Sequence, residues 1–292
     1  MIRYDIDADD LRALVEQLVP GWIARAQTRT DAFRDRGRYE EQNPIWSEIK
    51  PVFMQVQGDG KCCFCERKFE SGDLGRYELD VEHFRPKGSI RPWSCPQSLV
   101  DDGVTLTTPP DANSGYYLLS YNLLNYAVAC KACNSGLKKD YFPIAGAYDP
   151  HGDDPRQMTA ERPWLIYPIG LMDVDPEEVI TFDGVLPRSS TVDPVLRLRG
   201  LVTIMFFGLD DVIGRKNLML ERAMIVRLLY DELIQATDQG NTNAAALVEE
   251  MQAPTALHAN CARSFARLFR SDRARATEIA ESLRRFLQSR SL

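Results

Sequence analysis

Two C-x-x-C pairs constrain this chain more strongly than any other feature of its sequence. Cys62 and Cys65 form the first pair, and Cys130 and Cys133 form the second. Such a turn brings two thiolates close enough to bind one metal ion, and two turns complete a tetrahedral sulfur site without an open position. The sequence therefore predicts a structural zinc ion, which requires residues 66–129 to fold between the two pairs.

The composition predicts a cytoplasmic protein without a membrane segment. Of the 292 residues, 44% are apolar and 26% are charged, which is typical of a globular protein. Four cysteines in metal-type spacing, within an odd total of seven, suit a reducing compartment better than a disulfide framework. No apolar run approaches the roughly 18 residues of a membrane helix, and the acidic N-terminus does not resemble a signal peptide. A net charge of −7 argues against non-specific coating of nucleic acid.

Helical periodicity dominates the N-terminal segment, residues 1–60. Apolar residues recur at helical spacing over 8–36, and Pro20-Gly21 is expected to bend or split this helix. A second helix is expected over 45–56, after an Asn-Pro cap signal. We expect these helices to pack against the zinc module and to carry no chemistry.

The middle of the chain, residues 61–145, reads as a small mixed module. The pattern indicates one strand over 76–84 and a second over 126–130. Four prolines within 88–115 indicate a long surface loop between the strands. Residues 131–139 are expected to form a helix, so the predicted order is strand, loop, strand, helix.

Residues 146–292 are expected to form a mainly helical C-terminal region. A hairpin is predicted over 178–186, around Asp183-Gly184. The helical patterns that follow cover about 195–208, 211–237, 242–252, 254–270 and 272–289. The predicted fold class is therefore α+β, mainly α.

A family resemblance lies on the residues enclosed by the cysteine pairs. Glu82-His83, then Asn125, then Asn134 after the last cysteine resemble the HNH endonuclease motif in its H-N-N form. The stretches DVEHFRPK, YLLSYNLLNYAVACKACNSGLKKDYFPI and YDPHGDDP resemble bacterial HNH proteins of Septu-type and retron-associated anti-phage systems. The resemblance is dense over 45–155. It implies a ββα-metal core, an endonuclease acting as the effector of a defence system, and an SMC-like ATPase as partner protein.

The enclosed residues suit phosphodiester hydrolysis, which needs a base for water and a cation for the developing charges. Glu82 and Asn134 offer oxygen ligands for a catalytic Mg²⁺ or Mn²⁺, and Asp80 is a candidate additional ligand. The resemblance assigns metal binding to Glu82 and Asn134, and the general-base role to His83. Neighbouring strand residues point to opposite faces, so the strand must twist or end at His83 for one site to use both.

Further roles concern orientation and substrate binding. The resemblance implies that Asn125 orients the histidine loop through its amide. Arg85, Lys87 and Lys138 are candidates for contacts with the substrate phosphates. We expect DNA as the substrate in preference to RNA.

Two alternatives stay open from the sequence. The same site suits cleavage of structured RNA such as tRNA. A zinc-stabilised nucleic-acid-binding module without catalysis is the alternative from another class, although such a module has no need for an acid-histidine pair inside the clasp. The chain contains no G-x-x-x-x-G-K-[ST] motif, so any dependence on ATP would come from the partner.

Overall fold

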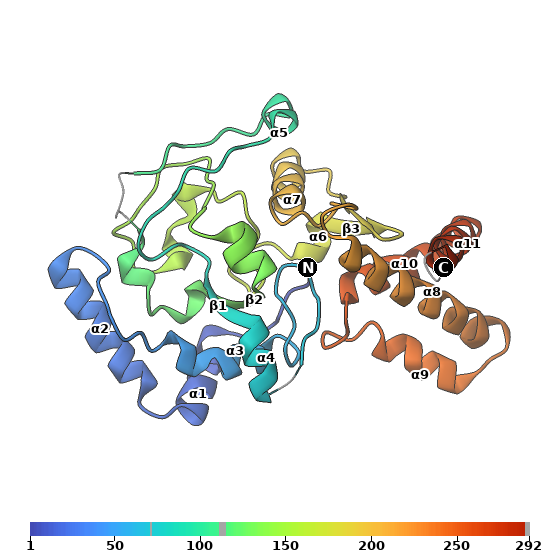
Figure 1. The fold of residues 1–292 in the computed structure, drawn as a ribbon, viewed down its shortest axis with the longest axis horizontal. Helices are drawn as coiled ribbons and strands as arrows, with labels where there is room; N and C mark the ends of the chain where they lie inside the picture. Colours follow the sequence, from blue (N-terminus) through green and yellow to red (C-terminus); the bar gives the residue numbers. More distant parts are fainter. Residues whose placement is uncertain (71, 111–114, 290–292) are drawn as a thin grey trace.

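The computed structural model describes residues 1–70, 72–110 and 115–289. Helices dominate, and the described strands form two two-stranded sheets, β1–β2 and β3–β4, so the α+β, mainly α prediction is confirmed. Figure 1 shows β1–β2 near the middle of the molecule, between the N-terminal helices and the C-terminal helices. No helix in these ranges has the length and apolar character needed to cross a membrane.

The N-terminal segment forms α1 (Ala8–Leu18) and α2 (Trp22–Arg36), so the predicted split is confirmed. Gly21 lies between them at a φ of 74°, a left-handed conformation that glycine adopts without steric cost. The predicted helix over 45–56 is instead a 3-10 turn, η1 (Trp46–Ile49), followed by α3 (Lys50–Val56). Proline lacks a backbone N–H and fits a first helical turn, so Pro51, the second residue of α3, does not kink it.

The central sheet pairs β1 (Leu79–His83) with β2 (Tyr126–Cys130) in antiparallel register, with His83 opposite Tyr126. The strand prediction over 76–84 started too early, because its first residues belong to α4 (Gly72–Glu78). The prediction of a strand over 126–130 is confirmed. The strand β1 ends at His83, and a site shared by Glu82 and His83 stays a prediction.

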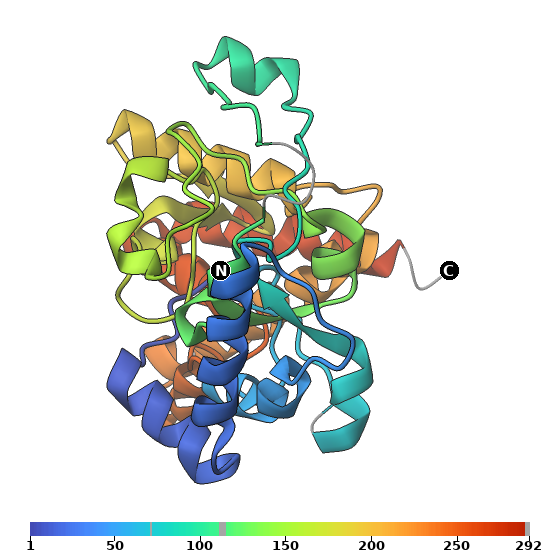
Figure 2. The same cartoon turned by 90° about the vertical axis from the view of Figure 1, so that its left-hand side faces the viewer.

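Two segments around this sheet differ from the sequence expectation. The long loop over 88–115 contains a short helix, α5 (Gln97–Asp101), which stands out at one edge in Figures 1 and 2. Residues 111–114 of that loop lie outside the described residues. The expected helix over 131–139 is a π-helix, η4 (Ala132–Lys138), and not an α-helix.

The C-terminal region contains the predicted hairpin, formed by β3 (Ile180–Asp183) and β4 (Leu186–Ser189). The helix expected over about 211–237 begins only at Lys216. The Asp211 carboxylate accepts from the Gly214 N–H at 2.8 Å in the turn before it. The helices of this region are α6 (Pro176–Val179), α7 (Pro194–Phe206), α8 (Lys216–Asp238), α9 (Thr242–Glu250), α10 (Ala259–Ser271) and α11 (Arg273–Gln288).

One apolar core connects these parts. It includes Trp22 of α2, Phe53 of α3, Phe142 after η4 and Phe207 after α7. Phe207 stacks on Phe64 of the first cysteine knuckle, with ring centroids 3.9 Å apart. The division into segments 1–60, 61–145 and 146–292 as separately folded units stays a prediction.

Candidate metal centre and active site

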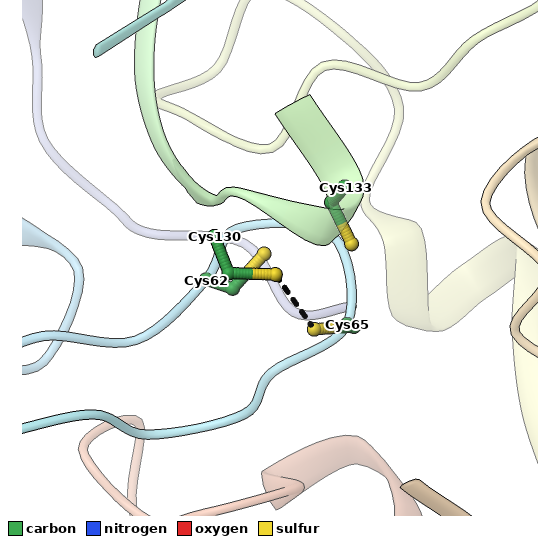
Figure 3. A group of neighbouring side chains, drawn as sticks. All are labelled: Cys62, Cys65, Cys130 and Cys133. Atoms are coloured by element: carbon green, nitrogen blue, oxygen red, sulfur yellow. Dashed lines mark hydrogen bonds between the residues drawn. The ribbon is translucent and has the colours of Figure 1, made fainter. Parts of the chain in front are cut away.

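The four predicted zinc ligands converge in the fold. The Sγ atoms of Cys62, Cys65, Cys130 and Cys133 all lie within 4.8 Å of one another, and all four side chains are buried (Figure 3). The Sγ atoms of Cys65 and Cys130 are 3.8 Å apart. A tetrahedron with Zn–S bonds of about 2.3 Å has edges of about 3.8 Å. Donor chemistry and spacing therefore both fit a zinc ion, as expected from the sequence.

Backbone hydrogen bonds hold the two knuckles together. The Cys63 N–H donates to the Val128 carbonyl of β2 at 3.0 Å, which connects the first knuckle to the strand that leads into the second. The Gln57 side chain donates to the same carbonyl at 2.7 Å and accepts from the Val128 N–H at 2.6 Å. Cys63 is thus a buried connecting residue and not a fifth ligand.

The C-terminal region reaches the metal centre through Arg215. Its Nη1 lies 3.4 Å from the Cys133 Sγ and donates to the Phe207 carbonyl at 2.6 Å. A guanidinium beside a thiolate stabilises the negative charge of a zinc–thiolate group. Nothing in the cysteine spacing pointed to Arg215, because it lies far from both pairs in the chain.

Glu82 is buried on the face of β1 that packs against η4. Its Oε1 lies 3.1 Å from the Lys138 Nζ, and both side chains are almost fully buried. Burial raises the pKa of Glu82, and the Lys138 ammonium opposes that rise. Among the described residues, Oε1 has no hydrogen-bond donor of acceptable geometry. An oxygen without a donor fits a cation ligand, although the Lys138 ammonium already lies beside it.

His83 occupies the other face of β1, where its ring is packed between two aromatic side chains. The ring meets Trp46 and Tyr126 edge-on, with centroids 5.0 Å apart in each case. Its Nε2 lies 3.1 Å from the Ser120 carbonyl oxygen. A carbonyl can only accept, so Nε2 carries the proton and Nδ1 is left with a lone pair. Burial, together with the Lys87 charge, holds the pKa of His83 well below its usual value.

Asn125 connects two backbone segments near His83, and its expected orienting role stays a prediction. Its side chain accepts from the Arg85 N–H at 2.7 Å and donates to the Arg85 carbonyl at 2.9 Å. A further hydrogen bond, at 3.2 Å, reaches the Leu119 carbonyl, one residue before Ser120. One buried amide thereby connects the segment after His83 to the segment that supplies the histidine's carbonyl partner.

Two lysine ammonium groups act electrostatically on side chains of both faces of β1. The charges of Lys87 and Lys138 both act on Glu82 and on His83. The Lys87 Nζ lies 4.5 Å from the centre of the Trp46 ring, a distance at which a cation is attracted to an aromatic face. Glu82 and His83 therefore share one electrostatic environment although their side chains point apart.

The other predicted site residues have varied surroundings. Asn134 is half-buried at the start of η4, one turn before Lys138, and its side-chain amide makes no hydrogen bond to the described residues. Asp80 is partly exposed and lies 3.4 Å from the Lys131 ammonium. Arg85 is buried, with its Nε 2.7 Å from the Glu161 carboxylate. The burial of Arg85 and Lys138 does not fit the expected contact with substrate phosphates.

Sequence reasoning missed several residues that build the site. Trp46 belongs to the N-terminal segment, which was expected to carry no chemistry, yet its ring forms one wall around His83. Ser120 contributes a backbone carbonyl, to which the Tyr126 hydroxyl also donates. Glu161 neutralises Arg85 from beyond the central module. No local signal marks these residues, since each acts through a contact distant in the chain.

Comparison with known proteins yields a distant relative. The chain is 32% identical over 124 residues to the Septu protein PtuB of Bacillus mycoides (strain KBAB4). The matched part makes up 42% of this chain and 35% of the relative, so the chain spans about a third of that protein's length. The chain is a distant homologue of that protein. No protein-family model and no solved structure matches.

Proposed function

We propose that this protein is a metal-dependent HNH endonuclease that hydrolyses phosphodiester bonds as the effector of an anti-phage defence system. The observation that carries the proposal is the buried His83, whose Nε2–H donates to the Ser120 carbonyl, adjacent in β1 to the buried Glu82 and enclosed by a four-cysteine clasp. A module that only binds nucleic acid needs neither the fixed tautomer nor the buried acid.

His83 acts as the general base in this proposal. Its Nε2–H is held by the Ser120 carbonyl, which fixes the ring orientation and leaves Nδ1 free to take a proton from water. Because its pKa is lowered, the imidazole is neutral and able to accept that proton at neutral pH. Asn125 keeps the residues that follow His83 in place.

Glu82 and Asn134 would hold the catalytic Mg²⁺ or Mn²⁺, with Asp80 as a candidate further ligand. A divalent ion held by these residues would supply stabilisation of the negative charge on the phosphate and on the leaving oxygen. Lys87, positioned over Trp46, remains the candidate for a substrate phosphate contact. Zinc in the cysteine site supports the fold and takes no part in the chemistry.

The biological role rests on the distant homology to a Septu protein together with the motif resemblance. We propose DNA as the substrate and an SMC-like ATPase as the partner that restrains or directs the nuclease. A regulated partner would suit a chain whose net charge of −7 gives it little general attraction to nucleic acid.

The test is cleavage of plasmid, single-stranded DNA and total tRNA by purified protein in Mg²⁺, Mn²⁺ or EDTA. His83→Ala should reduce the cleavage rate about 10²- to 10⁴-fold. The matched control is His151→Ala, the same change at an exposed histidine that bonds only to Tyr117 among the described residues. Glu82→Ala and Asn134→Ala should also lose activity, and raised Mn²⁺ should rescue them in part.

The outcomes separate the alternatives. Unchanged cleavage by His83→Ala, with zinc content intact, would remove the enzyme mechanism and favour a non-catalytic zinc module. Cleavage of tRNA in preference to both DNA substrates would replace the proposed substrate by structured RNA. Absence of an ATPase among copurifying proteins would remove the anti-phage assignment and keep the nuclease.

A further inference from the structure

Lys138 is an unusual lysine because its charged end is completely buried. The side chain has 0% exposure, and its Nζ lies 3.1 Å from the Glu82 Oε1. Neither atom has a hydrogen-bond partner of acceptable geometry among the described residues. A buried charge without hydrogen bonds is costly, and an ion pair offsets only part of that cost. The protein therefore retains a strained arrangement at its candidate active site.

The arrangement is fixed at both ends. Glu82 lies within β1, and Lys138 is the last residue of η4, whose second residue is the zinc ligand Cys133. The Lys138 ammonium thus occupies the position beside the Glu82 Oε1 that a metal cation would take. Other charges around Glu82 come from Lys87 and Asp140, of which Asp140 is exposed enough to pair with Arg91 at 3.5 Å.

A divalent cation and this ammonium compete for the same oxygen. A hard cation binds carboxylate oxygen at about 2.0 to 2.6 Å, well inside the distance at which Lys138 now lies. Two like charges within a few ångströms of each other repel strongly in a buried site. Glu82 cannot serve both at once without a large penalty.

We propose that Lys138 is a positioning residue that exchanges with the divalent cation of the active site. In the metal-free protein it neutralises Glu82, and cation binding displaces its ammonium from Oε1. This inference rests on the proposed function. As a consequence, the metal-free protein has a lower affinity for the catalytic cation than the same oxygen ligands would have without Lys138. The site therefore binds the cation only at a higher cation concentration.

Calorimetric titration of zinc-loaded protein with Mn²⁺ tests the exchange without any cleavage assay. Mn²⁺ suits the probe because it prefers oxygen ligands and leaves thiolate sites to zinc. Lys138→Met should bind Mn²⁺ about tenfold or more tightly than the wild type, since the competing charge is gone. Lys139→Met is the matched control, because Lys139 is the exposed neighbour, and its affinity should stay within about twofold of the wild type. The double variant Glu82→Gln/Lys138→Met should lose the site.

Equal or weaker Mn²⁺ binding by Lys138→Met would overturn the exchange. Metal-dependent cleavage by the wild type would survive that result, so failure of this inference differs from failure of the proposed function. Lys138→Met leaves Glu82 without a counter-ion and can fail to fold without metal. In that case the proposed exchange of Lys138 with the cation predicts that Mn²⁺ present during refolding restores the folded variant. Failure of Mn²⁺ to restore folding would overturn the proposal. Lys138→Gln serves as the second neutral variant.

Discussion

Asn125→Ala tests whether one amide holds the histidine segment in place. The side chain is fully buried and makes three hydrogen bonds, two to the Arg85 backbone and one to the Leu119 carbonyl. Each neutral hydrogen bond contributes about 1 kcal/mol net, so their loss should lower the free energy of unfolding by about 3 kcal/mol. The Arg85 N–H and carbonyl lose their side-chain partner, whereas the Leu119 carbonyl still accepts from the Asn122 N–H at 3.2 Å.

The assay is urea denaturation followed by tryptophan fluorescence, with zinc held constant in the buffer. Asn122→Ala is the matched control, since the half-buried Asn122 accepts from the Leu124 N–H at a partly buried position and donates to the Asp153 carbonyl at an exposed one. Water replaces such bonds, so the control should lose less than about 1 kcal/mol. Zinc content should be unchanged in both variants, because neither residue touches a thiol.

Catalysis provides a second measurement on the same variant. The cleavage rate of Asn125→Ala should fall between those of the wild type and His83→Ala, because the amide orients the base and does not react. If Asn125→Ala proves no less stable than Asn122→Ala, the reasoning from buried hydrogen bonds is refuted. A stable variant with wild-type cleavage would also remove the orienting role.

The remaining predictions concern zinc, pH and the partner. The wild type should contain one zinc ion per chain, and Cys130→Ser should lose it and become protease-sensitive, as metal analysis and limited proteolysis can check. The wild-type cleavage rate should rise with pH through an inflection below about 6.5 and then level off, since the pKa of His83 is lowered by burial. The pKa of His258 is also lowered by burial, so the unfolded chain binds more protons and stability should fall as pH drops below about 6.5, measurable by urea denaturation. Pull-down from the native operon should recover an ATPase, and recovery of this chain alone would contradict the proposed partner.

The sequence was most informative where a pattern is local. The C-x-x-C pairs fixed four residues that the fold brings together, and the strand over 126–130 followed from a short apolar run. Period-based reasoning also located the hairpin near Asp183-Gly184, because turn residues separate its two strands.

Sequence reasoning failed where the structure depends on distant contacts or on helix type. The packing of Trp46 on His83 and the ion pair of Glu161 with Arg85 join residues far apart in the chain, and neither leaves a local pattern. The π-helical form of η4, which includes the zinc-ligand candidate Cys133 and ends at Lys138 beside Glu82, was likewise not predicted. Periodicity over seven residues is too short to separate it from an α-helix.

The π-helical form of η4 allows the number of residues in that turn to change without turning Lys138 away from Glu82. Deleting Ser135 or Gly136 would shorten the path from Cys133 to Lys138 by one residue. If an ordinary α-helix formed, its four remaining steps of about 100° would turn the chain by about 400°. The five steps of the wider π-helical turn rotate the chain by about the same amount, because its hydrogen bonds join residues five apart. A one-residue gap in this turn of a distant relative is therefore compatible with an intact site.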